Sequence, residues 1–171
     1  MLKAPLPNTI EPRRAAEQGL SFQGSIPLKR LERLVTFLEG EEGTIEVSLS
    51  FGIDEEKIRY LNGKAEASVQ MLCQRCLKPV AIALKAELNL GLVRDDKAAS
   101  MLPGRYDPLI FTKELEVKEA IEEELILTLP LIAVHQDCAV KTEYRDPSAK
   151  SEGDDKPNPF SVLAQLKGNK H

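Results

Sequence analysis

Apolar and polar residues recur with two different periods along the first half of the chain. Residues 27–38 carry apolar side chains at helical spacing, and Pro27 suits the first turn of a helix, where its missing N–H would have no partner. From Thr44 to Ile53 the period changes to two, with apolar residues on one face and polar residues on the other. The same period returns over residues 80–93. These patterns predict one helix followed by two half-buried strands.

The segments between and after these strands are less regular. Residues 57–72 alternate imperfectly, and Asn62-Gly63 indicates a turn or bulge inside them, so they form one bent strand or two short ones. Residues 92–110 contain Asp, Pro and Gly pairs that favour a surface loop. Residues 115–127 again carry an apolar stripe at helical spacing, which predicts a second helix with its glutamates in solvent.

Together these elements predict an α+β fold. No helical crossover separates the two clear strands, so we expect an antiparallel sheet of four to six strands, strongly bent or closed into a partial barrel, with the two main helices packed on one side. Residues 1–145 are then a single α+β domain. Residues 146–171 are expected to be a flexible linker and a short apolar and basic tail. The tail is expected to form a short C-terminal helix with Asn158 as its N-cap and Pro159 at its first position.

Composition narrows the classes of function. Of the 171 residues, 42% are apolar and 29% are charged, which is typical of a globular protein. No apolar run reaches the roughly 20 residues that span a bilayer, and the first residues lack the apolar region of a signal peptide, so we expect a cytoplasmic protein without a membrane partner. The net charge of −4 provides no global positive field, so any contact with RNA must be local.

Cysteine and histidine residues carry the most informative chemistry. Cys73 and Cys76 form a C-x-x-C pair between two alternating segments, where the turn of a hairpin lets two thiolates converge on one zinc ion. His135 and Cys138 form a second pair of the same spacing after the second helix, and the four residues make a candidate Cys₃His site for zinc. The alternative is that the cysteines are small buried apolar residues and that the histidine is structural. The spacing alone leaves both interpretations open.

Three segments of the chain resemble the YceD family. They are residues 72–79 with a C-x-R-C-L knuckle, residues 121–130 with an acidic helix that ends in Leu-Pro, and residues 156–163 in the tail. The resemblance implies a bacterial, non-enzymatic factor in ribosome biogenesis, needed for the synthesis, processing or accumulation of large-subunit (23S) ribosomal RNA. The expected partners are that RNA or a pre-ribosomal particle, a basic ribosomal protein, or an RNA-processing enzyme.

The resemblance also bears on the metal. Many members of the family carry a second Cys-x-x-Cys pair after the Leu-Pro end of the helix, whereas this chain has His135 and Cys138 there. If the metal has been lost in this chain, Cys73 and Cys76 remain as a reduced pair that packs the hairpin.

Four basic residues are candidates for contact with RNA or with another partner. Arg75 and Lys78 belong to the predicted turn, and Arg30 and Arg33 to the polar side of the first helix. Ordinary solvated surface charge explains these residues equally well.

The tail supports a different hypothesis, in which the protein is an adaptor that touches no RNA. Its apolar residues would then bind an RNA-processing enzyme as a short helix in a groove, with Phe160, Leu163 and Leu166 as anchors. Docking of the tail on the body of its own chain is the alternative.

The sequence gives little support to an enzyme, so we expect no catalytic residues. It has no P-loop, dinucleotide-binding or nucleophile-elbow motif. The three glutamates at 122–124 are consecutive, so they point around a helix instead of converging on a metal ion. The C-x-x-C pair joins two strands, whereas a thioredoxin-like pair begins a helix.

Overall fold

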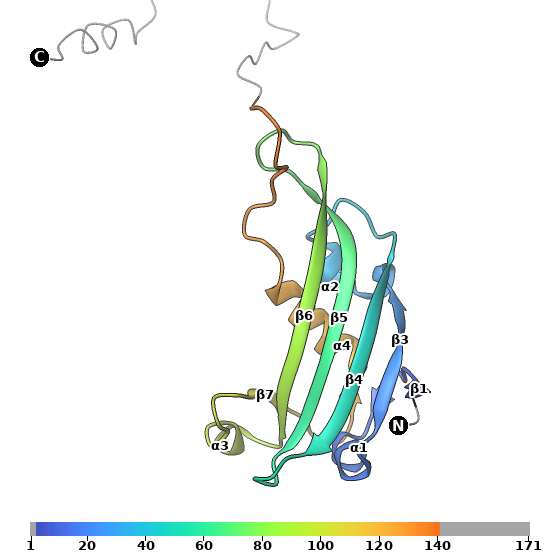
Figure 1. Ribbon diagram of the computed structural model, residues 1–171, viewed down its shortest axis with the longest axis vertical. Helices are drawn as coiled ribbons and strands as arrows, with labels where there is room; N and C mark the ends of the chain where they lie inside the picture. Colours follow the sequence, from blue (N-terminus) through green and yellow to red (C-terminus); the bar gives the residue numbers. More distant parts are fainter. Residues whose placement is uncertain (1–2, 141–171) are drawn as a thin grey trace, which may run out of the picture. The chain divides into compact units, whose positions relative to one another are not determined.

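A computed structural model describes residues 3–140 of the chain. Figure 1 shows a sheet of long strands with helices behind it. One sheet has six strands in the order β1-β3-β4-β5-β6-β7, and a second sheet pairs β2 with β8. The strands are β1 (Lys3–Pro5), β2 (Thr9–Ile10), β3 (Ser21–Pro27), β4 (Thr44–Ile53), β5 (Arg59–Leu72), β6 (Pro79–Val93), β7 (Asp107–Ile110) and β8 (Leu115–Glu116). The helices are α1 (Pro12–Gln18), α2 (Glu32–Val35), α3 (Asp96–Ala99) and α4 (Val117–Leu127), and a 3₁₀ turn occupies Leu28–Arg30.

The six-stranded sheet is antiparallel in its centre and parallel at its edges. Strands β3, β4, β5 and β6 pair antiparallel in chain order. At one edge β1 pairs parallel with β3, and at the other β7 pairs parallel with β6. Among the described residues no pairing joins β1 to β7, so the sheet is not a closed barrel. The predicted mixed α+β fold is confirmed, the antiparallel expectation is wrong for both edges, and strong bending of the sheet stays a prediction.

One face of the sheet is buried in the core. In β4 nearly every second side chain is buried, as its period-two pattern predicts, and β6 alternates in the same way over most of its length. These side chains share one core cluster with residues of the helices, among them Ala15, Leu34 and Ile121. Burial of one Leu or Ile side chain stabilises the fold by about 1.5–3 kcal/mol. The other face of the sheet carries mainly polar side chains.

The prediction of one continuous helix over residues 27–38 is wrong. A 3₁₀ turn is followed by the single turn of α2, and Leu31 between them is not helical (φ −98°, ψ 77°). Glu122 of α4 accounts for this break, because its Oε1 accepts hydrogen bonds from the N–H groups of Arg33 at 2.8 Å and Leu34 at 3.1 Å. A carboxylate from another element therefore caps the start of α2. Glu122 is only 4% exposed, so the expectation that all glutamates of its helix lie in solvent is also wrong.

The turn or bulge predicted at Asn62-Gly63 is wrong as well. Strand β5 is continuous, and both residues pair with β4. A Cβ atom at position 63 would lie 2.6 Å from the carbonyl oxygen of Ser48. The glycine is therefore needed for the close approach of β4 and not for a turn.

The surface loop predicted at residues 92–110 contains two regular elements. The carboxylate of Asp95 accepts the N–H of Ala98 at 2.7 Å and caps α3, although this helix has a single turn. Strand β7 follows and pairs with the end of β6. The second predicted helix begins two residues later than expected, at Val117, because the two residues before it form β8 with β2.

Four side chains, here called the tyrosine clamp, cover the polar face of the sheet at the end of β6 where β7 begins. They are Tyr60, Tyr106, Arg105 and Asp54. The ring of Tyr60 occupies the space above Gly52 of the neighbouring strand and stacks on Tyr106 with 6.2 Å between ring centroids. Tyr106 donates its hydroxyl hydrogen to Asp54 at 3.1 Å, and Arg105 binds the same carboxylate at 2.9 Å. The clamp therefore ties the loop before β7 to the β4–β5 turn.

Residue contacts group Met1–Ala139 into one compact unit. Within residues 3–140, no helix is long and apolar enough to cross a membrane. The linker and tail predicted at residues 146–171 lie outside the described residues, so the domain boundary at residue 145 and the C-terminal helix stay predictions.

Candidate metal centre

The turn between β5 and β6 holds the first cysteine pair, as the sequence predicts. Cys73 donates its N–H to the carbonyl oxygen of Lys78 at 2.9 Å, and Leu77 donates its N–H to the carbonyl oxygen of Cys73 at the same distance. Leu77 has a left-handed backbone (φ 56°), which costs a residue other than glycine about 1–2 kcal/mol. The tight turn sets the two thiols of the C-x-x-C pair close together.

The segment after α4 brings the second pair to this turn. Gln74 donates its N–H to the carbonyl oxygen of Ala133 at 2.8 Å, so the two backbones lie side by side. As a result, the ligand atoms of all four predicted residues lie within 4.8 Å of one another, and in the described part of the chain no second group of this kind occurs. The group consists of Cys73, Cys76, His135 and Cys138. Its side chains are the right kind and number to hold a metal ion.

The distances within the group match the edges of a tetrahedron around zinc. With zinc–sulfur bonds of about 2.3 Å, two sulfur atoms of a tetrahedral site lie roughly 3.8 Å apart. The Sγ atoms of Cys73 and Cys138 are 3.7 Å apart, and Cys76 Sγ lies 3.3 Å from Nδ1 of His135. All three cysteines are free thiols. The donor set and its spacing therefore fit a four-coordinate ion.

The imidazole of His135 is oriented by a second contact. Its Nε2 lies 3.0 Å from the carbonyl oxygen of Pro79. Because a carbonyl can only accept a hydrogen bond, Nε2 is the donor in this contact, and the neutral tautomer with its proton there leaves the lone pair of Nδ1, which faces Cys76, free for a metal. Metal-binding histidines are commonly oriented by such a contact of the other ring nitrogen.

Backbone N–H groups lower the pKa of one of the three thiols, that of Cys73. Burial raises the pKa of the Cys73 thiol, but the N–H groups of Cys76, His135 and Arg75 outweigh burial and lower this pKa to about 5. Burial raises the pKa of Cys76, and the neighbouring sulfur atoms of Cys73 and Cys138 raise it further. Negative charges on neighbouring sulfur atoms repel one another, and a bound cation between them would offset this repulsion.

Arg75 faces the centre, although the sequence placed it on an exposed turn. Its Nε donates to the sulfur of Cys138 at 2.9 Å. Its Nη2 donates to the carbonyl oxygens of His135 and Gln136, the second at 3.2 Å. The guanidinium therefore fastens the second pair to the turn, which a C-x-x-C motif alone does not predict.

The other three predicted contact residues lie in two places. Lys78 is exposed at the same turn as the centre. Arg30 is exposed and donates to the side chain of Asn8 at 3.4 Å, and Arg33 forms an ion pair with Glu123 at 2.9 Å. Within residues 3–140, no hydrogen bond or ion pair joins Lys78 to Arg30 or Arg33. Contact of the basic residues with RNA stays a prediction, and the tail anchors Phe160, Leu163 and Leu166 lie outside the described residues.

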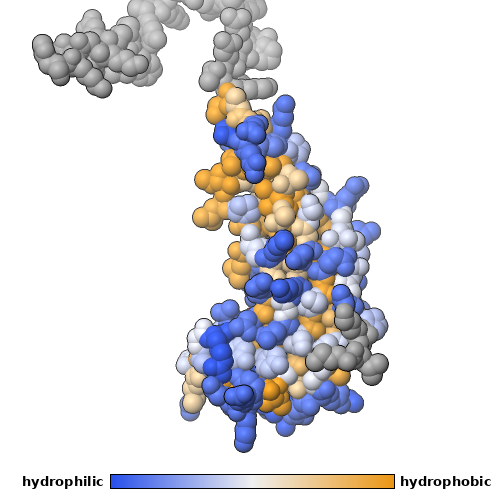
Figure 2. All heavy atoms as spheres, viewed as in Figure 1, coloured by the Kyte–Doolittle hydropathy of each residue, from blue (hydrophilic) through white to orange (hydrophobic). Residues whose placement is uncertain are grey.

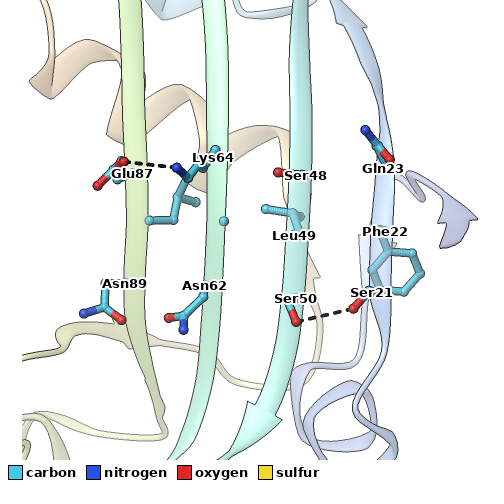
Figure 3. A pocket seen from close by; sticks show the side chains of 12 residues that line it. Ser21, Phe22, Gln23, Ser48, Leu49, Ser50, Asn62, Lys64, Glu87 and Asn89 are labelled. Carbon is cyan, nitrogen blue, oxygen red and sulfur yellow. Dashed lines mark hydrogen bonds and ion pairs between the residues drawn. The ribbon is translucent and has the colours of Figure 1, made fainter. Parts of the chain in front are cut away.

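The polar face of the sheet carries a shallow hollow of about 730 Å³ (Figure 3). One row of side chains crosses it, each opposite the next on neighbouring strands: Ser21, Ser50, Asn62 and Asn89. The hydroxyl oxygens of the two serines are 3.3 Å apart, and an ion pair of 3.3 Å joins Lys64 to Glu87 beside them. The hollow offers hydrogen bonds but no paired carboxylates or nucleophile with a base, so we assign it no chemistry.

Comparison with known proteins gives a consistent result over most of the chain. A family model described as "Large ribosomal RNA subunit accumulation protein YceD" matches residues 61–167. A curated relative with the same description, from Haemophilus influenzae, is 34% identical over 172 residues, which cover 98% of this chain and 99% of the relative. No solved structure matches.

Proposed function

Since the chain belongs to the YceD family, we propose that it is a non-enzymatic factor of ribosome biogenesis, needed for large-subunit ribosomal RNA to accumulate. The observation that carries this proposal is the similarity to a relative of that description over nearly the full length of both chains. A cytoplasmic location follows from this role and stays a prediction.

The metal centre has a structural role in this proposal. Three Sγ atoms and Nδ1 of His135 make a closed set of four donors, as in structural zinc sites, and leave no open position for a substrate. Zinc, when bound, supplies a cross-link between the β5–β6 turn and the segment after α4. His135 then stands where many members of the family have a cysteine.

Direct contact with ribosomal RNA depends on a few local cations in this proposal. Lys78 and Arg30 are exposed, and neither is engaged by a carboxylate among the described residues. Arg75 and Arg33 are less available, because Arg75 binds Cys138 and Arg33 is paired with a glutamate. With a net charge of −4, binding through so few cations is weak in total and weakens steeply as salt rises.

Crosslinking of the tagged chain to RNA in growing cells, followed by sequencing, tests this contact. The test variant carries Arg30→Ala and Lys78→Ala. The control variant carries Lys97→Ala and Lys113→Ala, which remove the same charge from exposed positions elsewhere. We expect the wild-type and control chains to enrich one region of large-subunit RNA and the test variant to lose that enrichment.

Two outcomes would contradict parts of this proposal. If the wild-type chain gives no crosslinks above background, direct contact is wrong and the adaptor hypothesis gains support, which removal of residues 158–171 would then test. If deletion of the gene leaves the level of large-subunit RNA unchanged, the proposed function itself is wrong.

A further inference from the structure

Among residues 3–140, one edge of strand β6 has no partner strand over most of its length. Its first edge pairs with β5 from Pro79 to Gly91. Its second edge pairs with β7 only from Leu90 to Val93. In the described part of the chain, no hydrogen bond reaches this second edge between Ala81 and Glu87.

The register of the hairpin shows which residues face the free edge. The hydrogen bond from Cys73 N–H to the carbonyl oxygen of Lys78 makes these two residues a bonded pair. Bonded and non-bonded pairs alternate in an antiparallel ladder, so the even-numbered residues of β6 bond to β5 and the odd-numbered residues point away from it. Pro79 and Val93 agree with this assignment, because the carbonyl oxygens of both accept hydrogen bonds from residues outside β5.

Four successive odd-numbered residues therefore present N–H and C=O groups that have no partner in the described part of the chain. They are Ala81, Ala83, Lys85 and Glu87, and all four are exposed. Such an edge is a template for an added strand. The contact at Pro79 bounds the edge on one side and β7 on the other, and a strand of ordinary length, about 5–10 residues, fits between them.

Unpaired carboxylates lie at the β7 end of this edge. Asp107 of β7 is in register with Leu90 of β6. Burial raises the pKa of Glu124, and the nearby charges of Asp107 and Glu123 raise it further. Within residues 3–140, Asp107 and Glu124 form no ion pair. The negative charge at this end therefore favours the binding of a segment that carries basic side chains there.

Exposed apolar side chains, here called the apolar flank, follow α4 toward the opposite end. The flank consists of Leu127, Leu131 and Ile132, which are 73%, 103% and 66% exposed. Their segment runs beside β6 from α4 to the β5–β6 turn (Figure 1), and Figure 2 shows apolar atoms gathered along this side. The next residue, Ala133, is bonded to the turn. Exposed apolar side chains that are gathered into one patch typically mark an interaction surface.

We propose that the free edge of β6 binds an extended segment of another protein, which adds to the sheet as a strand, with basic residues at the β7 end and apolar residues along the apolar flank. This inference deepens the proposed function, on which it rests, by giving the partner a chemical class. A second copy of β6 does not have this character, since Lys85 is its only basic residue.

The probe is a synthetic peptide, Thr-Lys-Arg-Val-Thr-Val-Thr-Val-Thr, which places its basic residues at the β7 end when it pairs antiparallel with β6. Hydrogen exchange of the isotope-labelled full-length chain is followed by NMR with and without the peptide. We expect the amides of Ala81, Ala83, Lys85 and Glu87 to exchange about tenfold more slowly with the peptide, while the even-numbered amides between them do not change. The control peptide replaces the lysine and the arginine with glutamates, so that neither a parallel nor an antiparallel strand brings a basic residue to the β7 end.

One residue of the edge offers a matched pair of variants. Ala83→Pro removes an N–H that faces the free edge and spares the bonds to β5, whereas Ala83→Ser keeps this N–H. We expect the proline variant to bind the peptide about tenfold more weakly and the serine variant to bind it normally. If the proline variant does not fold, a peptide N-methylated on the amides that face β6 tests the same bonds, and it should not bind the wild-type chain.

Three results would overturn the inference. The first is equal binding of the control peptide, and the second is the absence of protection at the four amides. The third is a chain that sediments as a dimer with these amides already protected, because a second copy then occupies the edge. The assay contains no RNA, so its failure is distinct from a failure of the proposed role in RNA accumulation.

Discussion

The carboxylate of Glu122 accepts the N–H of Leu34 at 3.1 Å, across 88 positions of the chain. The same oxygen accepts the N–H of Arg33 at 2.8 Å, so one buried side chain of α4 satisfies the first free N–H groups of α2. A buried carboxylate is tolerated only when such donors surround it. The position of α2 on the sheet therefore depends on α4.

Replacement of Glu122 by Ala should destabilise the protein by about 2–4 kcal/mol, because it removes two charge-assisted hydrogen bonds and leaves two N–H groups in the interior without partners. Chemical denaturation measures this loss. The matched control is Glu123→Ala, which breaks only an exposed ion pair with Arg33 and should cost about 1 kcal/mol or less. Similar losses for the two variants would contradict the capping role of Glu122.

The metal centre predicts one zinc ion in each purified chain. His135→Ala should lower the zinc content to a trace, because three sulfur ligands leave the tetrahedron incomplete. His135→Cys should retain zinc, since a fourth thiolate completes a tetrahedral Cys₄ site. Elemental analysis of the purified chains decides the question, and an absence of zinc in the wild-type chain prepared without chelators would favour the reduced, metal-free hairpin.

The lowered pKa of Cys73 predicts a pH dependence for the reduced, metal-free protein. The pKa of this thiol is about 5 in the folded chain, below its ordinary value of 9.0. A thiol with a lowered folded pKa adds stability that is complete above the ordinary value and is lost as the pH falls through the folded value. We therefore expect the difference in melting temperature between wild type and Cys73→Ser to shrink from pH 9 to pH 5. A difference that does not change with pH would refute the stabilised thiolate.

Arg75 and Lys78 belong to the same turn, but their replacement should affect the stability and the zinc retention of the protein differently. Arg75→Ala should lower both the melting temperature and the retention of zinc against a chelator, because the bonds to Cys138 and to two carbonyl groups are lost. Lys78→Ala should leave both quantities unchanged, since Lys78 is exposed. A normal chelator response for Arg75→Ala would show that its contacts do not hold the centre together.

Gly63→Ala should be strongly destabilising although alanine is compatible with a strand. The added Cβ would lie 2.6 Å from the carbonyl oxygen of Ser48 and 2.7 Å from Cδ2 of Leu49, so β4 and β5 would have to separate. Overpacking of this kind costs about 1–3 kcal/mol. Gly104→Ala is the control, because no atom lies within 4 Å of its added Cβ. Equal stability of both variants would mean that the sheet yields easily at this position.

Strong local periodicity allowed two strands to be predicted from the sequence. The strand predicted at residues 44–53 has these bounds in the structure, and the one predicted at residues 80–93 begins one residue earlier, at Pro79. Ligand chemistry and spacing likewise predicted that Cys73, Cys76, His135 and Cys138 come together, whereas metal binding by this group stays a prediction. The broken helix at 27–38 was not predictable, because its cause is the distant carboxylate of Glu122. Strand β3 was missed for a similar reason, since few of its residues are buried and its pairing with β1 and β4 defines it.

The role of Arg75 shows a second limit of sequence reasoning. A basic residue inside a C-x-x-C pair has the composition of a surface contact, and its spacing gives no direction for the side chain. The carbonyl groups and the sulfur that bind the guanidinium belong to residues 135–138, which lie beside the turn because Ala133 is bonded to Gln74. Residues whose partners come from another part of the chain are therefore the ones that pattern alone assigns wrongly.

The long hairpin of β5 and β6 is fastened at both of its ends. Residues 133–138 contact the turn, and the tyrosine clamp lies near β7. An isolated two-stranded ladder frays from its ends inward, because the terminal pairs have neighbours on one side only. Here fraying from either end must first detach a segment from elsewhere in the chain, either residues 133–138 or the loop that carries Tyr106. The hairpin should therefore open cooperatively, and a displacement of one end should be accompanied by a displacement of the other.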